Sequence, residues 1–145
     1  MRNPKYVELS RRWFEEVWNQ NRMATVDELL APDVIIHGLG EGGTDLVGSH
    51  HFKAFQQKFA SAFTDLHIAV HDVLSEGDQT VIRISFRGTH TGEGLGIPPT
   101  GRKVSITGLV WIRWRDGRLI EGWNEFDAAG MLAQLTAPPA AKLRV

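Results

Sequence analysis

The chain has 145 residues, of which 42% are hydrophobic and 23% are charged, and its formal net charge is -1. These values are typical of one globular domain and give no electrostatic reason to expect a nucleic acid or an anionic membrane as a partner. The sequence contains no cysteine, which excludes disulfides, thiolate nucleophiles and cysteine-ligated zinc. It also lacks an N-terminal apolar segment or any apolar run of membrane-spanning length, so we expect a cytoplasmic protein.

Two helices are predicted near the N-terminus. Asn3 followed by Pro4 is a favourable helix start, and apolar residues then recur at helical spacing. Thr25 and Glu28 have the spacing of a capping box, which predicts a second, short helix that ends before Pro32.

Residues 33–39 then predict a strand with Ile35 and His37 on one face, followed by a glycine-rich loop. Ser49 is the expected cap of a third helix. That helix carries a stripe of aromatic residues at helical spacing, which predicts packing against a sheet. The stripe consists of Phe52, Phe55, Phe59 and Phe63.

The second half of the chain predicts four strands in succession, at residues 66–74, 79–89, 104–115 and 118–127. A last short helix is expected at 128–135, and we expect a loosely ordered tail at 136–145. Successive strands imply a curved antiparallel sheet, and about three N-terminal helices can cover one of its faces. The prediction is therefore one α+β domain over residues 1–135.

Asp116 and Gly117 stand between two apolar runs, which is a strong signal for a two-residue hairpin turn. If Arg115 pairs with Arg118, counting outward from the turn pairs Val110 with Trp123. Because side chains alternate along a strand, this pairing predicts which residues of the two strands share one face of the sheet. That face joins two carboxylates to an apolar surface, as a small-molecule pocket requires. Its expected members are Val110, Ile112, Trp123, Glu125 and Asp127.

Two stretches strongly resemble the SnoaL-like polyketide (ester) cyclase family. One is the loop from His90 to Arg102, with its His-Thr-Gly and Pro-Pro-Thr-Gly segments, and the other is the ending from Asp116 to Asp127. The likeness extends over roughly Tyr6 to Leu135. The resemblance implies an NTF2-like cone around an apolar pocket, assembled as a homodimer or homotetramer.

Cyclases of that family close a ring by intramolecular aldol condensation without a metal or another cofactor. An acid on the last strand acts as general acid/base, and the resemblance assigns this role to Asp127. The sequence departs from the family at Val110, where many members have aspartate, and at Gly122, where relatives often have histidine.

His37 and His90 are the other candidate catalytic residues, with a half-buried strand histidine and a loop-fixing histidine as the respective alternatives. A small apolar molecule is the expected ligand, and the outer sheet face is the expected subunit contact. Beside the hairpin residues, the expected pocket walls include Phe55, Phe59, Trp13 and Ile35.

Two other functions stay open. A non-catalytic binding protein of the same fold predicts that Asp127 is a structural carboxylate. An epoxide hydrolase requires an arginine between two aspartates in the pocket. We expect no metal at His67 and His71, because no third ligand has a recognisable spacing. The glycine pattern at 38–43 lacks the following βαβ unit of a dinucleotide site.

Overall fold

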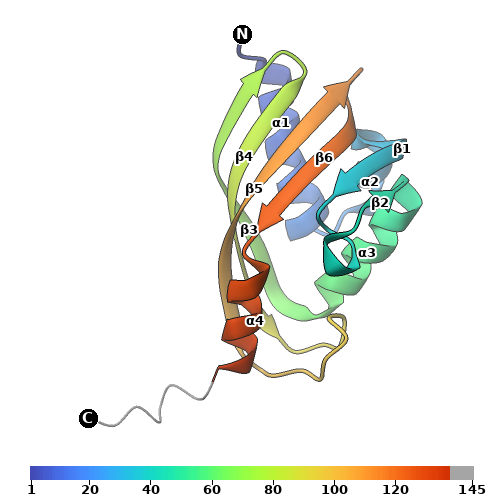
Figure 1. Cartoon of the computed structure of the whole chain (residues 1–145). Helices are drawn as coiled ribbons and strands as arrows, with labels where there is room; N and C mark the ends of the chain where they lie inside the picture. Colours follow the sequence, from blue (N-terminus) through green and yellow to red (C-terminus); the bar gives the residue numbers. More distant parts are fainter. Residues whose placement is uncertain (138–145) are drawn as a thin grey trace.

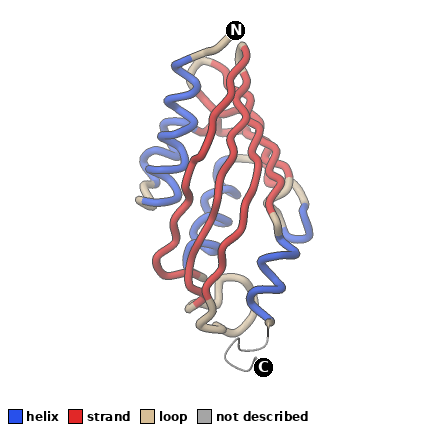
Figure 2. The backbone as a smooth tube through the Cα atoms, turned by 90° about the vertical axis from the view of Figure 1, so that its left-hand side faces the viewer, coloured by secondary structure: helices blue, strands red, loops and turns tan. Residues whose placement is uncertain are grey.

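A six-stranded, curved sheet runs through the whole molecule (Figures 1 and 2). The structure is a computed structural model, and it describes residues 1–137. The strand order is β2-β1-β6-β5-β4-β3, with β1 and β6 parallel and every other neighbouring pair antiparallel. The strands are β1 Leu30–His37, β2 Leu46–Val47, β3 Phe63–Glu76, β4 Gln79–His90, β5 Lys103–Arg115 and β6 Arg118–Phe126.

Helices cover the inner face of this sheet, and one further helix follows its last strand (Figure 1). This arrangement confirms the predicted α+β class and the cone of helices and sheet. The division into a domain at 1–135 and a tail at 136–145 stays a prediction, because residues 138–145 lie outside the described residues. The helical elements are α1 Pro4–Arg12, η1 Trp13–Asn19, α2 Met23–Leu29, η2 Glu41–Gly43, α3 Ser49–Ser61 and α4 Ala128–Thr136.

The first helix changes its hydrogen-bonding pattern halfway along. Residues Trp13–Asn19 form a π-helix, and the following Gln20 N–H donates to the Glu15 carbonyl, five residues back. π-helical turns are rare and often occur at functional sites. The side chains of Trp13, Phe14 and Trp18 are all buried here. The prediction of one regular helix was therefore wrong over this segment.

The second predicted helix start was also wrong. Helix α2 begins at Met23, so Thr25 and Glu28 lie within it and do not form a capping box. Instead, the Thr25 hydroxyl donates to Glu16 at 2.6 Å. The spacing of Thr25 and Glu28 is that of a capping box, but the Thr25 hydroxyl is hydrogen-bonded to the Glu16 carboxylate of the preceding helix.

Aromatic packing joins the helices to each other and to the sheet. The ring of Trp18 meets Phe52, Phe55 and Phe59 at centroid distances of 6.0–6.4 Å, each close to edge-on. Phe59 in turn contacts Phe86 on β4 at 5.6 Å. Burying one such side chain stabilises a fold by roughly 1.5–3 kcal/mol. Phe52, Phe55 and Phe59 of the predicted stripe therefore hold α3 over the sheet, whereas Phe63, which was predicted for the same helix, is the first residue of β3.

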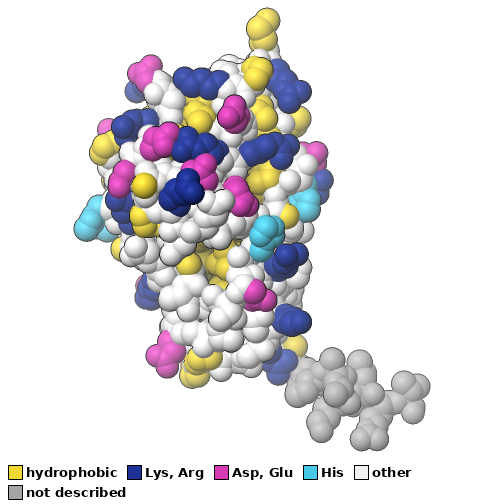
Figure 3. Space-filling view, turned by 180° about the vertical axis from the view of Figure 1, so that it is seen from behind, with side chains coloured by type: hydrophobic (Ala, Val, Ile, Leu, Met, Phe, Trp, Pro, Cys, Tyr) yellow, Lys and Arg dark blue, Asp and Glu magenta, His cyan; other side chains and the backbone are white. Residues whose placement is uncertain are grey.

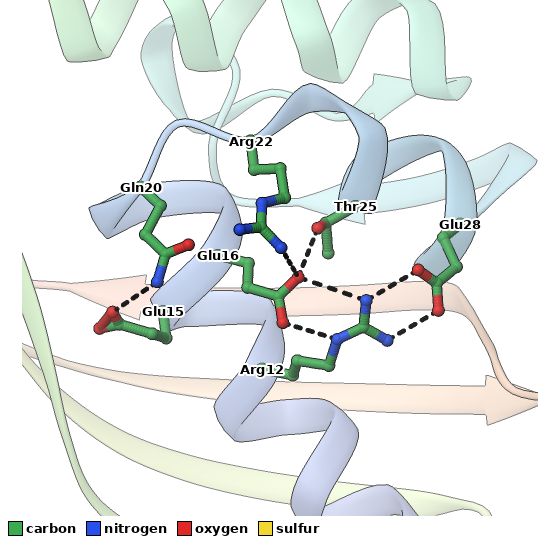
Figure 4. A network of polar contacts seen from close by, with 7 residues as sticks. All are labelled: Arg12, Glu15, Glu16, Gln20, Arg22, Thr25 and Glu28. Carbon is green, nitrogen blue, oxygen red and sulfur yellow. Dashed lines mark hydrogen bonds and ion pairs between the residues drawn. The ribbon is translucent and has the colours of Figure 1, made fainter.

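A polar network fixes α1, η1 and α2 on their outer side (Figure 4). The Arg12 guanidinium donates to both Glu16 and Glu28 at distances from 2.7 Å, and Arg22 also contacts Glu16 at 3.3 Å. Hydrogen bonding to Arg12, and then to the Thr25 hydroxyl, lowers the pKa of Glu16. The hydrogen bonds from Arg12 also lower the pKa of Glu28.

We predict that this network makes stability depend on acid pH. A carboxyl group with a lowered folded-state pKa stabilises the fold above its unfolded pKa of about 4.3, and that contribution disappears as the pH falls through the folded value. Arg12→Met should lower Tm at pH 7 by about 3 °C and flatten the loss of Tm below about pH 4.5. Arg11→Met is the matched control, because Arg11 is exposed and has no ion-pair partner among residues 1–137. Equal pH profiles for the two variants in calorimetry would contradict the prediction.

Candidate functional site

An apolar cavity lies between the inner face of the sheet and the helices. Its volume, measured as the space open to the centre of a water molecule, is about 90 Å³. A cavity that holds a single water molecule needs roughly 10–15 Å³ by the same measure. The helical wall comes from η1 and α3, and the sheet wall comes from β1, β4, β5 and β6. The lining side chains that fill these walls include Trp13, Phe14, Trp18, Ile36, Leu39, Phe52, Phe55, Phe59, Ile84, Phe86, Ile106, Val110, Ile112, Leu119, Asn124 and Phe126.

One extra residue in β6 decides which of its side chains face this cavity. The predicted turn is confirmed, since Arg115 pairs with Arg118 and Trp114 with Leu119. The next pair is Arg113 with Glu121, so Ile120 is the additional residue of a β-bulge. From this point the predicted pairing was wrong by one position, and in a strand a one-residue shift exchanges the two faces.

Gly122, Asn124 and Phe126 therefore face inward, while Trp123 and Glu125 lie on the outer side. Trp123 pairs with Trp111 across the strands and is not a lining residue, which corrects its predicted place in the pocket wall. Glu125 is exposed, although it contributes to the edge of the cavity beside Phe126.

The predicted acid, Asp127, also lies outside the cavity lining. It is the N-cap of α4, and one of its carboxylate oxygens accepts a hydrogen bond from the Gly130 N–H at 2.8 Å. Its side chain is exposed and lines a shallow outer depression together with Arg83 and Glu125. The sequence-based expectation that Asp127 projects into the pocket was wrong, because the bulge and the start of α4 turn it outward.

Most other predicted wall residues are where they were expected. Trp13, Phe55, Phe59, Val110 and Ile112 all line the cavity. Ile35 does not, because 38% of its surface is exposed, and the neighbouring Ile36 takes its place. The strand residues were sorted correctly into two faces, but the side of β1 that packs on the core is that of Val34 and Ile36.

His37 lies on the outer face at the end of β1. Its Nε2 is 2.8 Å from Glu121 on β6, and its Nδ1 is 2.9 Å from Asp45 in the following loop. The hydrogen bond to Glu121 raises the pKa of His37, with a further contribution from Asp45, and partial burial opposes the rise. The ring also stacks on Trp123 at a centroid distance of 5.3 Å. This histidine thus ties the loop after β1 to β6 and does not line the cavity.

His90 is fully buried at the end of β4, beneath the loop that follows. Its Nδ1 accepts from the Thr100 N–H at 3.2 Å, and its backbone pairs with Gly101 and Arg102, which closes the loop at its base. Nε2 has no hydrogen-bond partner among residues 1–137. His90 is also not a lining residue, and its contacts are those of the loop-fixing alternative.

Asn124 was not identified from the sequence as a lining residue, because the predicted pairing assigned Trp123 and Glu125 to the inner face of β6. The side-chain amide of Asn124 donates from Nδ2 to the backbone carbonyl of His37 at 3.1 Å. Gly38 allows this close approach of β1 and β6, because a Cβ there would lie 2.3 Å from the Asn124 carbonyl oxygen. Only the position of the bulge at Ile120 could have identified Asn124, and no residue type in the sequence marks that bulge.

Charged side chains of both signs are mixed on the helix side of the molecule. Seen from behind, acidic and basic side chains are interspersed without a large patch of one sign (Figure 3). Within residues 1–137 there is no group of three or more side chains placed to hold a metal ion. The helices described there are also too short or too polar to span a membrane.

Comparison with known proteins places these features in a family. Residues 8–135 match the family model of the SnoaL-like polyketide cyclases. The chain is 26% identical over 133 residues to the aklanonic acid methyl ester cyclase DnrD of Streptomyces peucetius, covering 91% of each chain. Its fold matches that of IdmH from Streptomyces antibioticus at 34% identity with a TM-score of 0.79, covering 92% of this chain and 99% of IdmH. A protein from Catenulispora acidiphila with a ketosteroid isomerase-like fold matches at 16% identity and a TM-score of 0.74, covering 90% of this chain and 94% of the other.

We predict that His37 makes stability sensitive to pH near neutrality. Because its folded-state pKa is raised, its contribution is fully present below the unfolded value of about 6.5 and is lost as the pH rises through the folded value. Wild-type Tm should therefore fall between pH 6 and pH 8 relative to that of His37→Gln. His67→Gln is the control, since His67 has no ion-pair partner among the described residues. If the Tm of His37→Gln had the same pH dependence as that of the wild type, the ionic contacts of His37 would not contribute to stability, and the prediction would be wrong.

Proposed function

Because the chain belongs to the SnoaL-like polyketide cyclase family, we propose that it closes a ring on an apolar carbonyl compound held in the cavity. The observation that carries this proposal is the cavity wall of aromatic and aliphatic side chains. Such a cavity excludes water and restricts a flexible chain to folded conformations. Holding two reacting groups together in this way removes much of the entropic barrier to ring closure.

The proposed reaction is an intramolecular aldol condensation. A carbon next to one carbonyl loses a proton and forms a bond to a second carbonyl carbon, and the oxygen of that second carbonyl gains a proton. No electrons are gained or lost overall, so the chemistry requires general acid/base groups and no redox cofactor. A substrate with extended conjugation would itself stabilise the intermediate enolate.

Asp127 remains the proposed acid/base, acting from the rim of the cavity. It follows directly after the lining residue Phe126, and the outer depression that contains it shares Glu125 and Phe126 with the cavity. An end of the substrate that extends past Phe126 would reach these two carboxylates. This role requires substrate to project from the cavity, because the Asp127 carboxylate does not line it.

A second candidate function is non-catalytic binding of a small apolar molecule. The specific observation in its favour is that Asp127 caps α4, which is a structural role for a carboxylate. Epoxide hydrolysis has weaker support, because no arginine is among the lining residues in the described part of the chain.

We predict that Asp127→Asn separates these functions. Asparagine is as good a helix N-cap as aspartate, so Tm should change little while the acid/base group is lost. The test substrate is aklanonic acid methyl ester, because the relative DnrD is named as the cyclase of this compound. With this substrate, the kcat of Asp127→Asn should be lower than that of the wild type by about 100-fold or more. The assay would separate the ester from its cyclised isomer by chromatography. Asp116→Asn, in the exposed hairpin turn, is the matched control.

Unchanged turnover in Asp127→Asn would exclude Asp127 as the acid/base and leave substrate folding as the main contribution of the cavity. Binding of the ester without any conversion by the wild type would favour the non-catalytic function.

We also propose that the protein forms a homodimer through the outer sheet face. Leu109 and Trp111 are neighbours on this face of β5 and expose 52% and 48% of their surfaces. Adjacent large apolar side chains at a protein surface often mark an association site. The ion pairs Arg83–Asp72 and Arg113–Glu121 provide polar groups around them.

We predict that Trp111→Glu will dissociate this dimer. A carboxylate in the centre of an apolar contact loses its hydration without gaining a partner. Sedimentation velocity should then give a dimer for the wild type and a monomer for the variant. Leu132→Glu, on the exposed side of α4, should remain dimeric. A monomeric wild type at micromolar concentration would contradict the proposal.

A further inference from the structure

The cavity wall has one polar feature that the proposed reaction has not used. Three lining residues have side chains that can accept a hydrogen bond, and they are Thr107, Asn124 and Glu125. Thr107 and Glu125 are exposed on the outer side of their strands, whereas Asn124 lies on the inner side between Gly122 and Phe126. Trp13 and Trp18 supply only N–H donors. Asn124 is therefore the side-chain acceptor on the inner face of the described cavity wall.

The orientation of the Asn124 amide is fixed. A backbone carbonyl can only accept hydrogen bonds, so the 3.1 Å contact with the His37 carbonyl must involve the Nδ2 end of the amide. The His37 peptide is itself held in place by pairing of His37 with Trp123 and by the contacts of the ring with Glu121 and Asp45. The opposite end of the amide, Oδ1, has no hydrogen-bond partner in residues 1–137.

We propose that Asn124 is a specificity-determining residue whose Oδ1 accepts a hydrogen bond from a hydroxyl or enol group of the bound apolar molecule. This inference rests on the proposed function of the cavity and names the polar group that its ligand carries. An apolar wall discriminates poorly between ligands of equal shape. A single fixed acceptor in it favours a ligand with a matching donor, because a buried hydroxyl without a partner is costly.

Ligand pairs of equal shape give the sharpest test. 2-Naphthol and 2-methylnaphthalene differ only in a hydroxyl and a methyl group, and their dissociation constants can be measured by NMR titration of the labelled protein. The preference is the Kd of 2-methylnaphthalene divided by that of 2-naphthol. In Asn124→Leu this preference should fall about tenfold relative to the wild type, which corresponds to the loss of one hydrogen bond to a buried hydroxyl.

Two further variants control for changes in packing. Val110 is the cross-strand neighbour of Asn124 on β5 and lies in the same part of the wall. Val110→Ala should weaken the binding of both ligands and change the preference by no more than about twofold. Asn124→Asp keeps the size of the side chain but has no hydrogen to donate to the His37 carbonyl, so the acceptor loses its fixed orientation and the preference for 2-naphthol should also fall. In the wild type, the Asn124 side-chain amide signals should shift more with 2-naphthol than with 2-methylnaphthalene, and this readout does not depend on any variant.

The possible failures are distinguishable. If neither compound binds the wild type, the proposed ligand-binding function of the cavity is overturned. If both bind and the preference is the same in the wild type and Asn124→Leu, the cavity function stands and the role of Asn124 is overturned. Should Asn124→Leu not fold, equal shifts of the wild-type Asn124 amide with both compounds would lead to the same rejection.

Discussion

The pairing of β5 with β6 is the constraint on which the site depends. One additional residue, Ile120, shifts this pairing immediately after the hairpin turn. Every side chain beyond it changes face, so Asn124 and Phe126 enter the cavity wall while Trp123 and Glu125 turn to the outer side. The position of a single bulge thus determines which chemical groups a ligand can meet.

The ionic contacts lie on the outer face of the sheet, and the apolar cavity wall lies on its inner face. On the outer face, His37, Glu121 and Asp45 hold the loop after β1 against β6. On the inner face, the His37 carbonyl orients the Asn124 amide. An ionic cluster outside the cavity therefore fixes the polar group inside it, and the charges themselves stay away from the apolar wall. This separation avoids the cost of burying an ionised group.

One irregular segment contributes to the cavity wall, and another is fixed at the end of β4. The π-helix η1 contributes Trp13, Phe14 and Trp18, which pack against the phenylalanine stripe of α3. At the far end, the buried His90 fixes the loop after β4 through Thr100. Regular elements form the cone and most of the cavity wall, and the π-helix and the bulge determine which further side chains join that wall.

The sequence by itself determined the elements and the class of fold. Periodicity identified all four long strands, the aromatic face of α3 and the final helix, because each is set by residues close together in the chain. It also identified Asp116 and Gly117 as the turn. The loop and C-terminal motifs indicated the family that the comparison then established.

Three features could be seen only in the tertiary structure: the π-helix, the bulge at Ile120 and the outward position of Asp127. A bulge changes the relation between two strands without leaving a signal in either one, and the inner side of β1 depends on which face packs against α3. Asn124 lines the cavity for the same reason, since its inward position follows from its partner on β5 and not from its neighbours in the sequence.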